Sequence, residues 1–330
     1  MRAAAPWVLG AVAAYALPFL LDRLELRMAI EILYLGLFAV SFNLLLGYAG
    51  LLSFGFNASF GIGAYAFALI LTHLSLPLIP AMFFAIAAGG AAGLAMGAVC
   101  VRLAGGYFSL MTLGLCQLLF AIAIKWRGLT NGEDGIFVQV PDLRFPYFGV
   151  LRLDVEANLY VFVLSVVLFC LWLMWRFTRS PLGQAVILVR ENSERASFLG
   201  YDIYAVKLLV FTLAGTMAAV AGVLFALLQR LVSPATFSLM QGGEPLFMAV
   251  LGGTGWFFGP FLGTIVYALF QDWLSRTTEH WPFFIGFLFV LLVIYAPGGL
   301  VAIAQRLRAA SIGQTATPVG ATGNSHRSIS

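Results

Sequence analysis

The sequence predicts an all-α protein, a polytopic bundle of transmembrane helices. Of its 330 residues, 62% are hydrophobic and only 10% are charged, which leaves too few charges to cover the surface of a water-soluble domain. Apolar stretches that could cross a ~30 Å hydrocarbon layer as helices of about 20 residues recur along nearly the whole chain. The 35 glycines favour closely packed helices, because small residues let helix backbones approach each other in lipid.

About ten apolar spans follow one another along the chain. They are predicted at residues 3–21, 28–46, 54–72, 78–101, 106–124, 158–175, 208–228, 237–252, 257–274 and 283–304. Residues 1–308 therefore form one predicted membrane domain, in which broken or re-entrant segments can occur where glycine and proline gather. Residues 309–330 are predicted to be a disordered tail, because they can bury too little apolar surface to fold.

The first span has two interpretations. A lone Arg2 and the triplet Ala14-Tyr15-Ala16 are compatible with a signal peptide that is removed. Because the other spans follow behind it, an uncleaved membrane helix is the favoured interpretation.

The distribution of Lys and Arg predicts the orientation in the membrane. Residues 176–207 carry five of the 18 basic residues, and Arg306 and Arg308 follow the last span. Since Lys and Arg gather on the cytoplasmic side, both regions are placed in the cytoplasm. Counting spans backwards puts residues 126–157 outside, as a small ordered loop, and both termini in the cytoplasm. Arg23 and Arg27 then fall outside and depart from the rule.

The sequence carries no set of residues expected to act as a catalytic or metal site. Its three histidines, His73, His280 and His326, lie far apart, and the spans hold no catalytic motif. A nucleotide-binding P-loop needs a lysine after a fixed glycine spacing, which neither Lys125 nor Lys207 has. The chain is therefore predicted not to be an enzyme and to bind no cofactor. Its net charge of +4 reflects orientation and implies no nucleic-acid partner.

Polar side chains within the spans are the candidates for a translocation path. The candidates are Ser53, Asn57, Thr112, Gln117 and Glu244. Glu31 also falls near the start of a span, where an interfacial position is favoured over an internal polar cavity. Glu244 lies among glycines and a proline, which suggests a broken helix with either a pathway or a packing role.

Two glycine-dense blocks, at residues 47–63 and 251–263, also have two interpretations. Glycines four residues apart allow tight helix packing. Alternatively, each block interrupts a helix and exposes its backbone to a polar path in the middle of the membrane. In that case Ser53 and Asn57 would supply hydrogen bonds.

The polar interruption at residues 176–207 is predicted to form a compact helical knob. Ser180 is a plausible N-cap before Pro181, and residues 182–189 can form a short amphipathic helix. The knob would offer a soluble protein a place to bind, and an ordinary solvated loop is the alternative.

A second short helix is expected at the tip of the knob. Ser193 can cap it, and Gly200 can end it in the left-handed conformation. Phe198 and Leu199 would then lie exposed at the tip, suited to a groove on a partner.

These residues resemble a known family. The run from Glu194 through Arg195 and Ala196 to Gly200 is similar to the EAA-type loop of ABC-importer permeases, with Arg195 in place of the central alanine. The wider pattern, over residues 30–303, is similar to the LivM-type permeases for branched-chain amino acids. It is carried by Gly47-Tyr48-Ala49-Gly50, Gly61-Ile62-Gly63-Ala64-Tyr65, Gly106-Tyr107-Phe108, Met111-Thr112-Leu113, Trp126-Arg127, Leu129-Thr130, Gly132, Asp134-Gly135, Ser180-Pro181-Leu182-Gly183, Arg190-Glu191-Asn192, Arg195-Ala196, Leu199-Gly200-Tyr201, Ser233-Pro234, Gly243-Glu244, Leu251-Gly252-Gly253, Tyr295, Pro297, Gly299 and Leu300.

The resemblance implies a multi-pass permease of a bacterial inner-membrane importer for branched-chain amino acids. The implied partners are a second, LivH-like permease in a heterodimer, two ATP-binding subunits that use ATP-Mg, and an extracytoplasmic solute-binding protein. The positions matching the ATPase-coupling loop are Arg190, Glu191, Asn192, Glu194, Arg195, Ala196, Gly200 and Tyr201. The candidate contacts with the binding protein are Thr130, Gly132 and Asp134.

Departures from the family pattern leave the solute open. Leu51 stands where glutamine is frequent, Asn57 where histidine is, and residues 254–256 where Arg-Gly is frequent. The same type of importer carrying urea or short amides is therefore an alternative.

A secondary transporter driven by an ion gradient is the alternative from another class. It would depend on intramembrane acids to bind the coupling ion, and the candidates are Glu31, Glu244 and Asp272. An intramembrane enzyme is disfavoured, because no catalytic set of residues converges.

Overall fold

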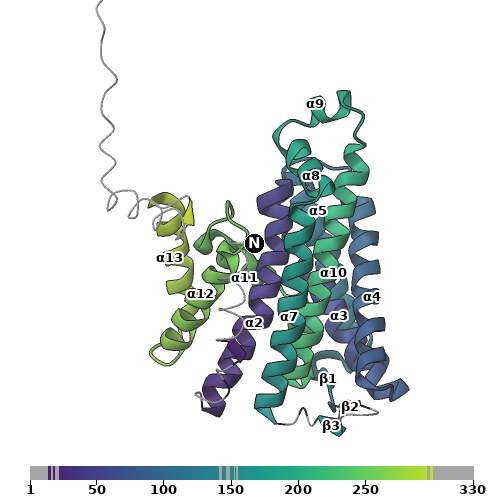
Figure 1. Ribbon diagram of the computed structural model, residues 1–330. Coiled ribbons are helices and arrows are strands. Elements are labelled where there is room, and N and C mark those ends of the chain that lie inside the picture. The colour runs from purple at the N-terminus through teal and green to yellow at the C-terminus, as the bar shows by residue number, and fades with distance from the viewer. Residues whose placement is uncertain are drawn as a thin grey trace, which may run out of the picture.

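The computed structural model describes residues 22–140 and 155–295, together with residues 14, 15, 18, 143–145, 149–151, 153, 298 and 299. Helices dominate this part of the chain and stand side by side as a bundle (Figure 1). The predicted span at residues 3–21 lies almost entirely outside the described residues. The predicted tail at residues 309–330 lies wholly outside them.

Six of the described helices are long and apolar enough to cross a membrane. They are α2 (Arg23–Asn43) with its continuation η2 (Leu44–Ala49), α3 (Asn57–Leu69) with η3 (Ile70–Leu74), α4 (Leu78–Cys100), α5 (Gly106–Lys125), α7 (Glu156–Thr178) and α10 (Ile203–Gln229). Each coincides with a predicted span, because a long apolar run can satisfy its backbone hydrogen bonds in lipid only as a helix or a closed barrel. The predicted polytopic helical bundle is confirmed.

Helix α10 lies in the middle of the bundle and packs against α2, α3 and α4. Small residues make this close approach possible. A Cβ atom added at Gly222 of α10 would lie 2.0 Å from the carbonyl oxygen of Phe60 on α3, and one added at Gly63 would lie 2.6 Å from the carbonyl oxygen of Ala219. The two helices therefore touch through their backbones, as small residues allow in lipid.

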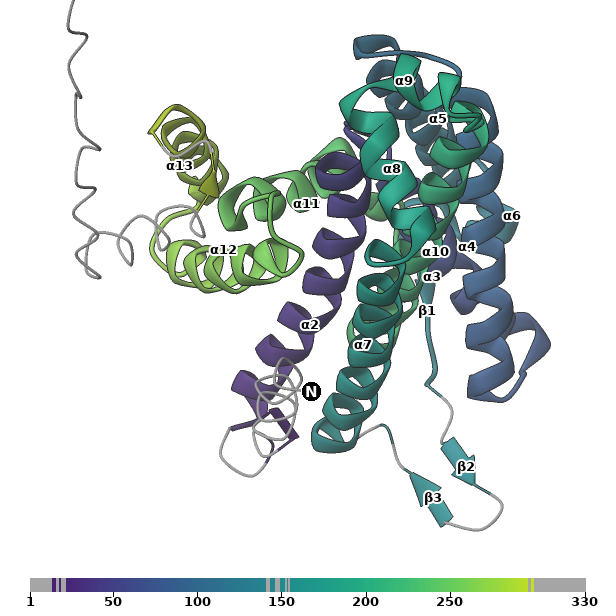
Figure 2. The same cartoon turned by 45° about the horizontal axis from the view of Figure 1, so that its top comes forward.

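A second group of helices stands beside this bundle, with α2 in contact with both groups (Figure 2). It consists of α11 (Leu239–Gly252), α12 (Gly259–Ser275) and α13 (Trp281–Tyr295). As described, each is shorter than the about 20 residues that a perpendicular crossing requires. Apolar composition alone predicts about ten crossings, whereas the described residues contain six helices of spanning length.

The helix break suggested around Glu244 is wrong. Helix α11 runs without interruption through Gly242, Gly243 and Pro245. A proline removes one hydrogen bond from the helical ladder, but α11 is supported by its packing against α2 and α12. The irregular backbone comes before α11, in β4 (Leu231–Val232) and the short 3₁₀ helix η5 (Pro234–Phe237).

A second irregular stretch, residues 50–56, connects η2 to α3. The π-helix η2 ends at Gly50, which has a left-handed φ of +68°. Leu51, Ser53 and Phe56 in this stretch are buried. The first glycine block therefore contains a helix interruption near its start and close helix packing further on. That its backbone lines a polar path stays a prediction.

The connections at the two ends of the bundle differ. At one end, α8 (Pro181–Glu191) and α9 (Ser193–Phe198) project beyond the long helices. The opposite end carries α6 (Arg127–Thr130), η4 (Gly132–Asp134) and two short antiparallel sheets, in which β1 (Ile136–Phe137) pairs with β4 and β2 (Leu143–Phe145) pairs with β3 (Gly149–Leu151). The two polar segments thus lie at opposite ends of the bundle, as the distribution of basic residues predicts.

Candidate functional site

The projecting segment is built by successive helix caps. Ser180 caps α8, its hydroxyl accepting a hydrogen bond of 3.2 Å from a first-turn backbone N–H, and Pro181 holds the first helical position. Both features agree with the sequence prediction. Asn192 caps α9 by accepting a hydrogen bond of 2.9 Å from the backbone N–H of Arg195. The predicted cap, Ser193, is instead the first residue of α9, because Asn192 has the extended backbone that an N-cap requires.

Gly200 ends α9 in the left-handed conformation, with a φ of +85°, as predicted. The backbone N–H of Gly200 donates a hydrogen bond of 2.9 Å to the carbonyl of Ser197, and that of Tyr201 donates one of 3.1 Å to the carbonyl of Ala196. This pair of bonds forms a Schellman motif. The position needs a residue without a Cβ, because left-handed backbone is strained for most side chains.

Three large side chains project from the end of this segment. Phe198 is 91% exposed, Leu199 68% and Tyr201 43%, and we call these three residues the α9 tip. Glu194 and Arg195 beside them are also exposed. Apolar side chains held outside a bundle by a capped helix, with charged neighbours, are typical of an interaction site.

Helix α8 fastens the α9 tip to the bundle. Its buried residues are Gly183, Ala185, Val186 and Val189, and it packs against α7 and α10. A Cβ atom added at Gly183 would lie 2.3 Å from the carbonyl oxygen of Phe177 at the end of α7. The corner between α7 and α8 is therefore in backbone contact and has little room to bend.

Asn57 connects the two irregular segments inside the bundle. Its amide nitrogen donates hydrogen bonds of 3.1 Å to the carbonyl of Thr236 and 2.9 Å to that of Ser238. Its amide oxygen accepts one of 3.2 Å from the thiol of Cys116 on α5. We call these four residues the Asn57 junction. Irregular backbone at membrane depth must find its hydrogen bonds inside the protein or in water, and Asn57 supplies them here.

Two other path candidates lie near this junction. Thr112 is fully buried on α5, and a Cβ atom added at Gly55 would lie 1.9 Å from its carbonyl oxygen. Its hydroxyl donates a hydrogen bond of 2.9 Å to the carbonyl of Ser109, one turn earlier. Gln117 follows Cys116 on α5 and is half-buried. These contacts do not assign the hydroxyl of Thr112 or the amide of Gln117 to the binding of a solute.

Ser53 and Glu244 have different surroundings. Ser53 lies in the irregular stretch before α3, and its buried hydroxyl has no hydrogen-bond partner among the described residues. Glu244 lies on α11, where it accepts a hydrogen bond of 2.9 Å from the side chain of Gln241. Helix α11 packs against α2, which carries the half-buried Glu31. Among the described residues, no hydrogen bond joins Ser53 or Glu244 to another path candidate.

The loop of residues 126–137, at the end of the bundle opposite α9, presents only part of the predicted binding-protein contact. The hydroxyl of Thr130 donates a hydrogen bond of 2.6 Å to the carbonyl of Ala123, and Gly132 is buried with a φ of +65°. Both residues shape the loop. Asp134 is exposed, and Phe137 nearby is 72% exposed. Asp134 is thus the predicted contact whose side chain is free to meet another protein.

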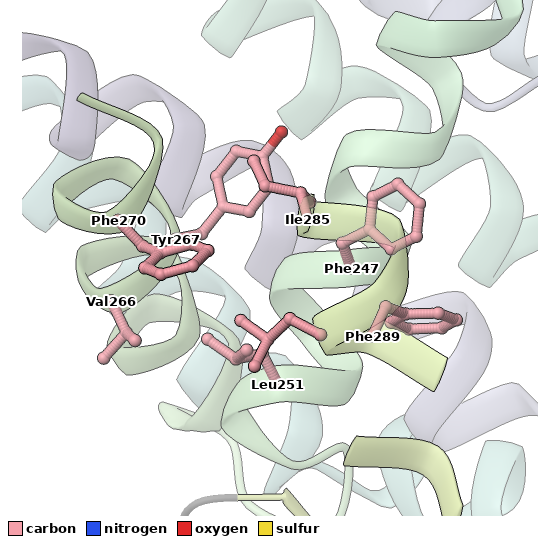
Figure 3. Close-up of a pocket in the computed structure, with 8 residues that line it drawn as sticks. Phe247, Leu251, Val266, Tyr267, Phe270, Ile285 and Phe289 are labelled. Atoms are coloured by element: carbon pink, nitrogen blue, oxygen red, sulfur yellow. The ribbon is translucent and has the colours of Figure 1, made fainter. Parts of the chain in front are cut away.

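A small apolar cavity lies between α11, α12 and α13 (Figure 3). Its volume is about 20 Å³, and it is lined by Phe247, Leu251, Val266, Tyr267, Phe270, Ile285, Leu288 and Phe289. Figure 3 shows the hydroxyl of Tyr267 pointing away from Val266 and Leu251. A cavity of this size has room for little more than a water molecule, so it is not a site for an amino acid. Across the described part of the chain, no group of His, Cys, Asp and Glu could hold a metal.

Sequence reasoning missed residues whose roles depend on distant contacts. Cys116 in the Asn57 junction carries no sequence signal, because its partners come from other segments. Asp202 also escaped notice, although it caps α10 with hydrogen bonds of 2.9 Å and 3.1 Å from the backbone N–H groups of Tyr204 and Ala205. An Asp directly before a long apolar run could have identified that cap.

Comparisons with known proteins agree on one family. Residues 25–294 match the family model described as the permease component of the branched-chain amino acid transport system. The chain is 29% identical over 314 residues to the high-affinity branched-chain amino acid permease protein LivM of Salmonella typhimurium, covering 89% of this chain and 74% of that protein. It is 24% identical over 322 residues to a probable LivM of Methanocaldococcus jannaschii, covering 82% and 92%.

The chain is also similar to LivH, another branched-chain amino acid transport system permease protein. It is 25% identical over 289 residues to LivH of Escherichia coli, covering 80% of this chain and 90% of that protein. No solved structure matches the chain.

Proposed function

Because the chain belongs to the permease family of branched-chain amino acid transport systems, we propose that it is the membrane-spanning subunit of an ABC importer for branched-chain amino acids. ATP hydrolysis by separate subunits would be coupled to it through residues 190–201. The chain itself would bind no cofactor and catalyse no reaction, and the partner subunits would use ATP-Mg.

The observation that carries this proposal is the α9 tip. Three apolar side chains are held beyond the end of the bundle by a helix that has defined caps at both ends. Exposed apolar side chains in water are unfavourable unless a partner covers them. A permease of this family requires an ATP-binding subunit on the cytoplasmic side, and a groove on that subunit would cover the α9 tip.

The opposite end supports a second contact. There β1 pairs with β4, so the loop after α5 is tied to the segment after α10. Asp134 and Phe137 are exposed on this ordered surface. We assign this surface to the extracytoplasmic solute-binding protein. Both termini of the chain would then lie in the cytoplasm. A LivH-like second permease would complete the complex in a bacterial inner membrane.

The interior fits a solute path of low affinity. The side chains of Asn57 and Thr112 form hydrogen bonds to backbone carbonyls of the protein. The other path candidates are Ser53, Gln117 and Glu244. Selection of the solute would then rest mainly with the binding protein. Leucine-like amino acids are the proposed solutes. Urea or short amides are the alternative, because Leu51 and Asn57 differ from the residues that are frequent at these positions in the family.

Reconstitution tests the proposal. The complete complex, two permeases with both ATP-binding subunits, is placed in proteoliposomes with the binding protein on the substrate side. Uptake of labelled leucine should require ATP on the side of the ATP-binding subunits and should persist when an uncoupler removes ion gradients. Uptake that an uncoupler abolishes, and that ATP does not affect, would show an ion-coupled transporter instead. Competition by urea but not by leucine would correct the solute.

A further inference from the structure

Arg190 joins the projecting segment to the interrupted helix α2. It lies in the last turn of α8, and its guanidinium donates a hydrogen bond to the carbonyl oxygen of Gly47 in the π-helix η2. Its aliphatic chain lies over Gly50, where an added Cβ atom would be 3.1 Å from the Cγ of Arg190. The two residues in contact are separated by 143 positions in the sequence. The contact therefore connects two distant parts of the fold.

The segment that Arg190 grips is an irregular one. A π-helix has a different hydrogen-bond pattern from the α-helix that precedes it, and η2 ends at the left-handed Gly50. On its other side, η2 meets the connection between α11 and α12, because a Cβ atom added at Gly47 would lie 2.7 Å from the carbonyl oxygen of Thr254. η2 thus lies between α8 and the second helix group.

One side chain beside η2 has unmet hydrogen-bonding capacity. Asn43, one turn before Gly47, is 1% exposed, and neither its amide nitrogen nor its amide oxygen has a partner among the described residues. Leaving a buried polar group unpaired is unfavourable. A rearrangement of η2 that provided a partner for this amide would recover part of that cost.

From these contacts we propose that Arg190 is a positioning residue that transmits displacement of α8 to η2, and through η2 to the connection between α11 and α12. The proposal rests on the proposed function, in which an ATP-binding subunit moves the α9 tip. Because α8 is in backbone contact with α7 through Gly183, the segment moves as one piece. The guanidinium is then the group that passes this movement to the backbone carbonyl of Gly47 in η2.

An arginine suits this role. A carbonyl oxygen is gripped most strongly by a charged donor, and the guanidinium offers five N–H groups on a planar frame. A lysine at the same position keeps the charge and can donate to the same carbonyl through one ammonium group. An alanine removes the contact and leaves the caps and the α9 tip unchanged.

The experiment compares transport with ATP hydrolysis in the complete reconstituted complex. With Arg190→Ala, the ATP-binding subunits should remain bound and continue to hydrolyse ATP. The amount of leucine transported per ATP hydrolysed should fall about tenfold, which is within the range of factors by which coupled sites affect each other. Arg190→Lys should recover much of the ratio. Arg176→Ala is the matched control, because it removes an exposed charge from the end of α7 without contacting η2 in any hydrogen bond of the described residues.

A second variant tests the same contact from the other side. Gly50→Ala places a methyl group against the chain of Arg190 and also strains the left-handed backbone of Gly50. It should lower the same ratio, and combining it with Arg190→Ala should lower the ratio no further than Arg190→Ala alone. If neither variant lowers transport per ATP, or if the bound ATP-binding subunits are lost in proportion to transport, Arg190 is not a transmitting residue. Failure of the unmodified complex to show ATP-dependent uptake would refute the proposed function instead.

Discussion

The amide nitrogen of Asn57 donates a hydrogen bond of 2.9 Å to the carbonyl oxygen of Ser238, a residue 181 positions further along the chain. This bond joins the start of α3 to the start of α11. Both helices follow a stretch of irregular backbone, residues 50–56 and the η5 region. The fold therefore places its two irregular segments against each other and lets one side chain satisfy both the packing and the hydrogen bonding.

Replacing Asn57 by alanine should destabilise the permease. The buried carbonyl of Thr236 loses its donor, at a cost of about 1 to 3 kcal/mol. The thiol of Cys116 loses one of its two acceptors and keeps the carbonyl of Phe237. The measurement is the midpoint of unfolding by SDS in mixed micelles. Thr212→Ala is the control, since its hydroxyl bonds within its own helix at 2.8 Å. Equal unfolding midpoints for the two variants would contradict a structural role for Asn57.

The contact between α3 and α10 should not tolerate even a methyl group. Gly222→Ala would place a Cβ atom 2.0 Å from the carbonyl oxygen of Phe60, so the helices must separate at a cost of about 1 to 3 kcal/mol. Gly114→Ala on α5 has no atom within 4 Å and should be neutral or stabilising by up to about 1 kcal/mol. The same SDS titration measures both. A stable Gly222→Ala variant would contradict the backbone contact.

The long apolar helices could be predicted from the sequence because membrane burial imposes one backbone geometry on an apolar run. The caps at Ser180 and Gly200 were predictable too, because local backbone geometry selects these residue types. The prediction of a helix break around Pro245 was wrong, because packing against α2 and α12 keeps α11 helical. The Asn57 junction and the grip of Arg190 on Gly47 connect residues far apart in sequence, and no local pattern encodes such pairs.

The left-handed position at Gly200 should control the shape of the α9 tip. A Cβ atom added at Gly200 meets no atom within 4 Å. The effect of Gly200→Val therefore comes from the backbone, where a side chain in this conformation costs about 1 to 2 kcal/mol. Gly200→Asn should be milder, because asparagine accepts the left-handed region. Co-purification of the ATP-binding subunits should fall for valine and less for asparagine. Gly128→Val, at the opposite end and also without close neighbours, should leave co-purification unchanged.

Phe198 should be a major contributor to binding of the ATP-binding subunit. It is 91% exposed in the isolated chain, and its truncation to alanine should weaken association by about 2 kcal/mol or more, the level of an interface hot spot. Phe137→Ala is the matched control, because its ring is exposed at the other end of the molecule. Affinities of the two variants for purified ATP-binding subunit in nanodiscs measure the difference. Equal affinities would place the docking surface elsewhere.

Site-specific photo-crosslinking from position 198 tests most directly the claim that the α9 tip docks on an ATP-binding subunit. A photoreactive phenylalanine analogue replaces Phe198 in the complete complex in native membranes, and a second protein carries it at Phe137. Irradiation should join position 198 to the ATP-binding subunit, whereas position 137 should give no such product. Crosslinks from position 198 only to lipid or to the solute-binding protein would contradict the account.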